Sequence, residues 1–167
     1  MKVFISIGSN LGDRTANCER SLELLARTAG ITLINRSRTY ETTPWGVAGQ
    51  PDFINACAQL ETSLSPGELL AVARGIEAEM GRVETYRWGP RSIDVDVLLY
   101  GDAVVDEEAL SIPHPRMHER LFVLEPLCEI APMAIHPILK KSVRQLLYGL
   151  SGELPKELQA KGAFKNK

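Results

Sequence analysis

Two acidic side chains lie within an apolar segment. Asp94 and Asp96 alternate with Ile93, Val95 and Val97, which is the two-residue period of a β-strand. Their carboxylates therefore point to the same side, roughly 6.6 Å apart along the chain, and they repel each other unless a cation compensates them. This spacing predicts either a magnesium site, in which substrate phosphates and water complete the shell, or a salt-bridged or solvated edge strand.

Three arginines precede this pair in the same loop and favour the first interpretation. Arg82, Arg87 and Arg91 lie within ten residues of one another, and the chain has no lysine between Lys2 and Lys140. Any phosphate bound in this region would therefore meet the planar, bidentate guanidinium group. Carboxylates for a metal beside arginines for phosphate are the layout of a nucleotide triphosphate site. Arginines on a solvated surface are the alternative.

Two weaker patterns add little chemistry. The glycine-rich segment at 8–14 is neither a Walker A loop nor a GxGxxG motif, and most such segments are simple turns. His114 and His118 have the four-residue spacing of a helical metal site, but Pro113 and Pro115 argue against a regular helix across both. His136 is interpreted as structural or exposed.

The elements that must position these residues follow from periodicity and from helix start and stop signals. Ser65, Pro66 and Glu68 form a strong helix start with a capping box. Glycine and proline mark loops at 43–52 and 81–90. The predicted elements are strand 2–7, helix 14–28, strand 31–42, strand 53–61, a helix from 66 to about 80, strand 92–100, a short strand near 103–105, a partly helical stretch at 116–130 and a last helix around 143–150.

This order predicts an α+β protein of the ferredoxin-like class. The βαββαβ arrangement is an antiparallel sheet with two helices on one face, here with C-terminal helical additions. The opposite face of the sheet is expected to be open and to carry the site. We expect one domain over residues 1–167, with a loosely ordered tail from about residue 152.

Composition excludes some classes of protein. The chain has 167 residues, 44% of them hydrophobic, and a formal net charge of −2, which argues against coating nucleic acid or an anionic membrane. No signal peptide or membrane-spanning apolar run is visible. The cysteines Cys18, Cys57 and Cys128 are scattered among apolar residues, which indicates buried free thiols in a reducing compartment. We expect a cytoplasmic monomer with no nucleic-acid or membrane partner.

Motifs spread along the chain resemble one family. The segment RWGPRSIDVDVLL is similar to the signature of the 6-hydroxymethyl-7,8-dihydropterin pyrophosphokinases of folate biosynthesis. IGSNLGD, TPWG, QPDFINA, the Gly81–Arg82 pair and IPHPRMHER also fall where that family has counterparts. The resemblance extends to about residue 150. It implies transfer of pyrophosphate from ATP to the hydroxymethyl group of a reduced pterin, with attack on the β-phosphorus and release of AMP.

The resemblance implies roles on the ATP side. Asp94 and Asp96 would hold two Mg²⁺ ions that bind the triphosphate and help to activate the hydroxyl, and Arg82 and Arg91 would clamp phosphates and stabilise the transition state. The other implied ATP positions are Arg87 and Trp88 in a loop over ATP, His114, Pro115 and Arg120 in a segment that binds phosphates and the nucleoside, and Leu70, Glu77, Val97 and Ser111 in the adenosine pocket.

The resemblance also implies a pterin pocket. A flat polar ring needs stacking on its faces and hydrogen bonds at its edge. Phe53 and Phe122 match the aromatic walls, although a plain core role is the alternative for both. Asn55 matches the amide that reads the edge, since an amide both donates and accepts. The remaining implied contacts are Asp94 and the backbone groups of Thr43, Pro44 and Trp45.

The sequence departs from the family pattern at a few positions. Phe53 stands where a tyrosine is common, and Glu84 and Ala109 stand where arginines can occur. Trp45 changes the bulk of the first loop. These differences concern contact details, not the reaction.

Two other functions fit parts of the pattern. Ferredoxin-like sheets can stack RNA bases on aromatic residues, but the slight acidity, the missing RNP1 pattern and the central aspartates argue against it. A metal-dependent phosphohydrolase could use the same aspartates on water, with ADP or free phosphate as its product. For the pyrophosphokinase we expect ordered binding, with magnesium and ATP before the pterin.

Overall fold

The computed structural model describes residues 1–44, 49–83 and 89–152. The elements in chain order are β1 (Lys2–Ser9), α1 (Arg14–Arg27), β2 (Ile31–Arg36), β3 (Tyr40–Thr42), β4 (Phe53–Thr62), α2 (Pro66–Glu79), β5 (Asp94–Tyr100), β6 (Val105–Glu107), β7 (Leu110–Ile112), the 3-10 helix η1 (Met117–Glu119), α3 (Leu121–Ile130) and α4 (Val143–Ser151). The predicted mixed architecture with an antiparallel sheet is confirmed.

The main sheet has the order β2-β4-β1-β5, and β3 also pairs with β4. Every pairing within it is antiparallel. Gly8 on β1 lies opposite Asn55 of β4 on one side and opposite Asp94 of β5 on the other, while Ser6 lies opposite Asp96. Because residues in register across neighbouring strands point to the same face, this face gathers an amide and two carboxylates around one glycine.

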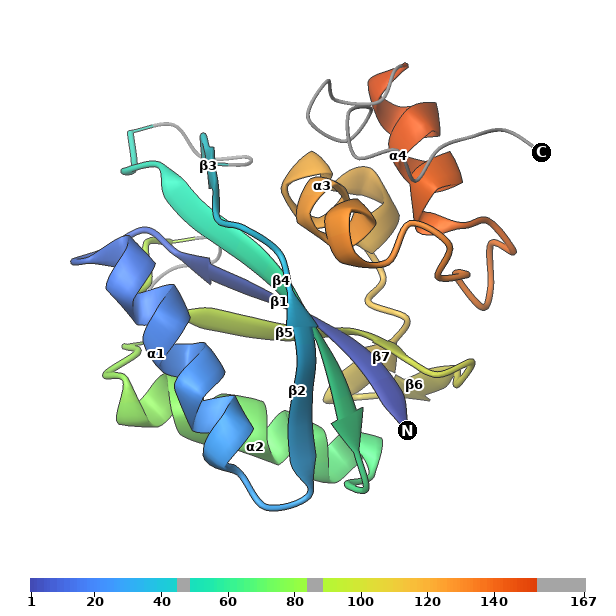
Figure 1. Cartoon of the computed structure of the whole chain (residues 1–167). Helices are drawn as coiled ribbons and strands as arrows, with labels where there is room; N and C mark the ends of the chain where they lie inside the picture. The colour runs from blue at the N-terminus through green and yellow to red at the C-terminus, as the bar shows by residue number, and fades with distance from the viewer. Residues whose placement is uncertain (45–48, 84–88, 153–167) are drawn as a thin grey trace.

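Helices α1 and α2 cover the other face of the sheet (Figure 1). Leu22 and Leu25 of α1 and Leu69 and Ile76 of α2 are buried in one apolar core with alternate residues of the strands. The predicted capping box is present, since Ser65 accepts from the Glu68 N–H and the Glu68 carboxylate accepts from the Ser65 N–H. A cap of this kind is worth about 1 kcal/mol. The expectation of two helices on one face is confirmed.

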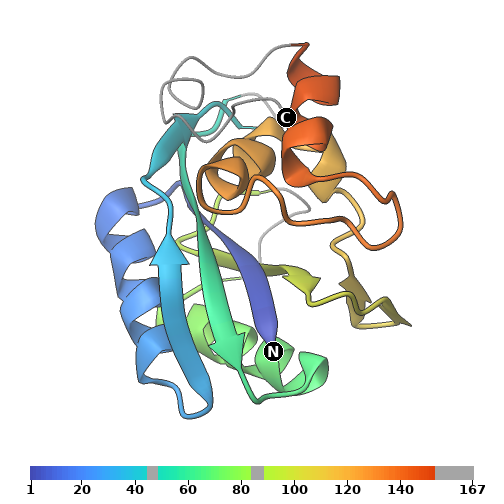
Figure 2. The ribbon, with the colours of Figure 1, turned by 45° about the vertical axis from the view of Figure 1, so that its right-hand side comes forward.

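The face that carries Asn55 and the aspartates is partly covered by α3, with α4 packed beyond it (Figure 2). The expectation of an open face was therefore wrong for this part of the sheet. The helices cover this part of the sheet because it carries a second apolar cluster. In this cluster, residues of α3 and α4 pack against four residues of the sheet, Phe4, Cys57, Leu98 and Leu99. The covering helices leave the remainder of the face as a walled cleft.

The predicted strand at 31–42 is two strands, β2 and β3. Ser37 leaves the regular β-ladder between them: its N–H donates to the Cys57 carbonyl at 2.9 Å, and its buried hydroxyl accepts from the Cys57 N–H at 3.0 Å. A side-chain hydroxyl thus replaces a ladder carbonyl. The pairing resumes at Tyr40, which lies opposite Asn55.

The structure also shows the short strand after β5 and the state of the three cysteines. The short strand expected near 103–105 is β6, which begins at Val105 and pairs with β7. All three cysteines are free and buried, as expected. Among the described residues, no helix has the length and apolar character needed to span a bilayer.

Candidate active site

A cavity of about 310 Å³ lies over the β1, β4 and β5 face, beside the start of α3. A volume of this size suits a small-molecule ligand. It is lined by Ser6, Gly8, Thr42, Thr43, Pro44, Phe53, Asn55, Arg82, Arg91, Asp94, Asp96, His114, Arg120 and Phe122. Residues from strands and loops far apart in sequence therefore meet in one place.

Most of the predicted site residues described by the structure line this cavity. Those brought together are Thr43, Pro44, Phe53, Asn55, Arg82, Arg91, Asp94, Asp96, His114, Arg120 and Phe122. Trp45, Arg87 and Trp88, together with Glu84, lie outside the described residues. The roles of all these side chains stay predictions, because position alone does not test them.

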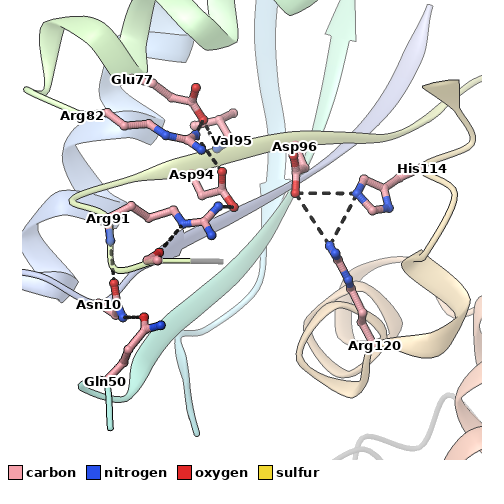
Figure 3. Close-up of polar contacts among 11 residues, drawn as sticks. Asn10, Gln50, Glu77, Arg82, Arg91, Asp94, Val95, Asp96, His114 and Arg120 are labelled. Carbon is pink, nitrogen blue, oxygen red and sulfur yellow. Dashed lines mark hydrogen bonds and ion pairs between the residues drawn. The ribbon is translucent and has the colours of Figure 1, made fainter. Parts of the chain in front are cut away.

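Asp94 is held between two arginines. Its Oδ1 accepts from Arg82 Nη1 at 2.7 Å, and its Oδ2 accepts from Arg91 Nη1 at 2.9 Å (Figure 3). Arg82 also donates to Glu77, which accepts the N–H of Val95 at 2.8 Å. Burial opposes the charge on Arg82, but the carboxylates of Asp94 and Glu77 outweigh it and raise the pKa of its guanidinium group.

Asp96 has weaker compensation than Asp94. Its Oδ2 lies 4.0 Å from Arg120 Nη1 and 3.8 Å from His114 Nε2, both beyond hydrogen-bond distance. Its half-buried position and the neighbouring Asp94 carboxylate raise the pKa of Asp96 above its ordinary value. A carboxylate in this position would gain from a cation placed in the cavity beside it.

His114 is a neutral neighbour of this carboxylate. Its Nδ1 accepts the N–H of Arg116 at 3.1 Å, and its Nε2 lies 3.4 Å from Arg120 Nη1 and 3.8 Å from Asp96 Oδ2. Burial, followed by the charge of Arg120, lowers the pKa of His114 to about 4. At neutral pH the imidazole therefore adds no positive charge beside Asp96.

The aspartates are the acidic groups through which the cavity could hold a metal. Among residues 1–44, 49–83 and 89–152, no group of three or more His, Cys, Asp or Glu side chains could hold a metal ion by itself. His118 contacts His136, with ring centroids 6.0 Å apart. The donor set is therefore two hard carboxylates, which fits Mg²⁺ with further oxygens from a phosphate ligand and water.

The opposite wall of the cavity suits a flat polar ring. Phe53 and Phe122 both line it, and Phe122 also packs against the second apolar cluster, so it has a core contact while its role toward a ligand stays a prediction. Asn55 is 3% exposed, and its Nδ2 donates to Thr42 Oγ1 at 2.7 Å. That bond fixes the amide and leaves its oxygen and second N–H for a ligand.

Sequence reasoning missed Ser6, Gly8 and Thr42. Ser6 and Gly8 share a face of β1, whose other face carries buried Val3, Ile5 and Ile7. The signal was present, since the small residues Ser6 and Gly8 alternate with β-branched ones in a central strand, and small side chains on one face leave space above that part of the sheet. Thr42 stands directly before the predicted Thr43.

Five predicted nucleoside contacts lie outside the cavity lining. Val97 is buried in the core between the sheet and α1 and α2, Glu77 is occupied with Arg82 and Val95, and Leu70 packs at the core edge. Ser111 lies on β7, and Pro115 follows His114. Their contacts with adenosine stay predictions.

Residues 4–132 match the family model described as 7,8-dihydro-6-hydroxymethylpterin-pyrophosphokinase (HPPK). Two relatives named 2-amino-4-hydroxy-6-hydroxymethyldihydropteridine pyrophosphokinase are similar to the chain. The protein of Methylorubrum extorquens is 48% identical over 131 residues, covering 78% of this chain and 83% of the relative. That of Bacillus subtilis is 46% identical over 127 residues, covering 76% of each.

Solved structures share the fold. A crystal structure described as HPPK-DHPS in complex with substrates has a TM-score of 0.73 at 13% identity and covers 98% of this chain. The Plasmodium falciparum HPPK-DHPS triple mutant has a TM-score of 0.71 at 17% identity and covers 93% of it. The chain spans 45% of each of these larger proteins.

Proposed function

Because the chain belongs to the 7,8-dihydro-6-hydroxymethylpterin-pyrophosphokinase family, it transfers pyrophosphate from ATP to the hydroxymethyl group of 6-hydroxymethyl-7,8-dihydropterin in folate biosynthesis, and we propose that the cavity over β1, β4 and β5 carries out this transfer. The observation that supports this placement is that two carboxylates, three arginines, an amide and two aromatic side chains line that cavity. In this transfer the pterin hydroxyl oxygen forms a bond to the β-phosphorus and its proton passes to solvent. The bond between the β-phosphorus and the oxygen that bridges to the α-phosphate breaks, and AMP leaves with that oxygen.

Asp94 and Asp96 would hold two magnesium ions with the triphosphate. Bound magnesium would neutralise phosphate charge and help to activate the hydroxyl. The proposal is supported by the poor compensation of Asp96, which lies 4.0 Å from its nearest guanidinium atom. Asp94 keeps its two arginines close, so phosphates bound to the same metals would meet Arg82 and Arg91 directly.

The arginines would align the triphosphate and stabilise charge that develops in the transition state. Phosphoryl-type transfer needs positioning and electrostatics more than covalent catalysis. Arg82 and Arg91 approach from one side of the aspartates, and Arg120 approaches from the other with His114 beside it (Figure 3). A transferring group placed between them would be surrounded by donors on two sides.

The reduced pterin would stack between Phe53 and Phe122, with its edge against Asn55. The Thr42 hydroxyl holds the Asn55 amide, which pre-organises the groups that read the ring. Thr43 and Pro44 line the same end of the cavity. The register places Asn55 and Asp94 on either side of Gly8, so the ring edge and the reacting group would lie over the two strands that flank β1.

We also assign the main sheet to the ferredoxin-like class, because the order β2-β4-β1-β5 with α1 and α2 on one face supports it. β3, β6, β7, α3 and α4 are then additions. The proposal also treats the protein as a magnesium-dependent monomer that binds ATP before the pterin, because the aspartates that would hold the metal of the nucleotide line the same cavity as Phe53 and Asn55.

The test is incubation with ATP, Mg²⁺ and 6-hydroxymethyl-7,8-dihydropterin, followed by separation of nucleotides and pterins. We expect AMP and the pterin pyrophosphate in equal amounts. Asp96→Ala should lose at least about 10³-fold in rate, the scale of losing a key charge-stabilising group. ADP or free phosphate without a pterin product would instead indicate a phosphohydrolase.

A further inference from the structure

Asn10 joins the two segments that precede β4 and β5, the strands on either side of β1. It follows β1 directly and is 1% exposed. Its Oδ1 accepts from the N–H of Arg91 at 2.8 Å, and its Nδ2 donates to Gln50 Oε1 at 3.1 Å and to the Pro51 carbonyl at 3.3 Å. One acceptor and both donors of the amide are therefore engaged, with partners 40 to 81 residues away in sequence.

The contact with Arg91 is double. Besides the side-chain bond, the Asn10 N–H donates to the Arg91 carbonyl at 3.2 Å, so both backbone groups of Arg91 are bonded to one residue. From this anchored backbone the Arg91 guanidinium reaches Asp94 Oδ2 at 2.9 Å (Figure 3). Fixing the backbone limits the positions that the guanidinium can take over the aspartates.

The contacts with Gln50 and Pro51 act on the other wall. These residues lead into β4, which begins at Phe53 and carries Asn55 two residues later. Both of those side chains line the cavity. The Asn10 amide thus bridges the segment that delivers the aromatic wall and the segment that delivers the arginine.

The side-chain amide of Asn17 makes similar contacts next to Asn10. Asn17 Nδ2, on α1, lies 2.9 Å from the Leu11 carbonyl, 3.1 Å from the Ser92 carbonyl and 3.2 Å from Ser9 Oγ. The contacts of Asn10 and Asn17 are therefore directional hydrogen bonds between polar groups. Hydrogen bonds of this kind specify geometry more narrowly than apolar packing does.

We propose that Asn10 is a positioning residue that sets the two walls of the cavity relative to each other, an inference that rests on the proposed function. Phosphoryl transfer between two bound substrates depends on their alignment, and a misplacement of about 1 Å can cost about 100-fold in rate. Asn10 itself is not among the residues that line the cavity. It acts through Arg91 on one side and through the Gln50–Pro51 backbone on the other.

Two variants of Asn10 separate these actions. Asn10→Asp keeps an acceptor for the Arg91 N–H but loses both donors and places a carboxylate against two oxygens. We expect its kcat to stay within about fivefold of the wild type and its KM for the pterin to rise at least about tenfold. Asn10→Ala loses all three side-chain contacts, so kcat should fall about 100-fold and KM for the pterin should rise as well.

A matched control distinguishes positioning from general destabilisation. Ser142→Ala removes the buried capping box of α4, away from the cavity, and should lower stability without changing kcat. A kcat loss in Ser142→Ala equal to that in Asn10→Ala would overturn the proposal.

Hydrogen exchange gives a readout that does not depend on activity. The Arg91 amide should exchange slowly in the wild type and in Asn10→Asp, and at least about tenfold faster in Asn10→Ala. Fast exchange in the wild type would refute the proposal whatever the enzyme does. If no pterin pyrophosphate forms, the proposed function fails; if it forms and folded Asn10→Ala keeps wild-type kcat, only this inference fails.

Discussion

Gly8 lies against Asn55 so closely that a side chain at position 8 would meet the amide. A Cβ built on Gly8 would lie 2.9 Å from Asn55 Oδ1 and 3.7 Å from the Phe53 ring. The backbone of Gly8 does not have the positive φ that favours glycine, so the demand for glycine here comes from space. The absent side chain leaves the floor of the cavity flat beneath the ring proposed to bind there.

Gly8→Ala should therefore impair pterin recognition without unfolding the protein. A displaced hydrogen bond costs about 1–3 kcal/mol, so kcat/KM for the pterin should fall about 10- to 100-fold, while the affinity for a nonhydrolysable ATP analogue stays within about twofold. Steady-state kinetics and calorimetry measure the two quantities. Gly75→Ala is the control, because a Cβ there meets nothing within 4 Å; equal effects in both variants would argue against this role.

Glu77 should matter through Arg82. Glu77→Gln keeps an oxygen for the Val95 N–H but removes the charge that pairs with Arg82. Charge-assisted hydrogen bonds contribute about 1.5–3 kcal/mol, so we expect kcat to fall about 10- to 100-fold. Glu79→Gln, an exposed change on the same helix, should leave kcat unchanged, and a wild-type rate in Glu77→Gln would show that Arg82 needs no such support.

Stability should decrease on acidification through His136. Its Nδ1 accepts from the N–H groups of Ile138 and Leu139 at 3.3 and 3.2 Å. Burial, followed by the proximity of His118, lowers the pKa of His136 from its ordinary value of 6.5. The unfolded chain therefore binds the proton first, so the stabilisation is present above about pH 6.5 and is lost as the pH falls below it.

Denaturant unfolding across pH measures this effect. The His136→Asn variant keeps a side-chain hydrogen-bond acceptor that does not titrate, so the stability difference between it and the wild type should shrink as the pH falls below about 6.5. A difference that is constant with pH, or that grows on acidification, would contradict a neutral His136 in the folded state.

Local patterns predicted the elements that carry the chemistry. The alternation around Asp94 and Asp96 predicted β5 and the shared face of the two carboxylates, and the Ser65 capping box predicted the start of α2; both are confirmed. The cover of α3 over the sheet could have been read from apolar Phe4 and Leu98 on the same face as the site.

Other features depend on contacts that no local pattern contains. The break between β2 and β3 depends on Ser37 bonding to Cys57, twenty residues away. The role of Asn10 depends on partners in two separate loops. Tertiary hydrogen bonds of this kind become visible only when the chain is folded, since a lone serine or asparagine in a turn is typical of any loop.

The central claim is that Asp94 and Asp96 hold the metal of the bound nucleotide. Anomalous diffraction from crystals grown with Mn²⁺ and a nonhydrolysable ATP analogue tests it most directly, because manganese replaces magnesium at oxygen ligands and is located independently of the protein atoms. We predict manganese peaks in contact with carboxylate oxygens of both residues and with the phosphates. A bound nucleotide whose manganese ions touch neither aspartate would contradict the account.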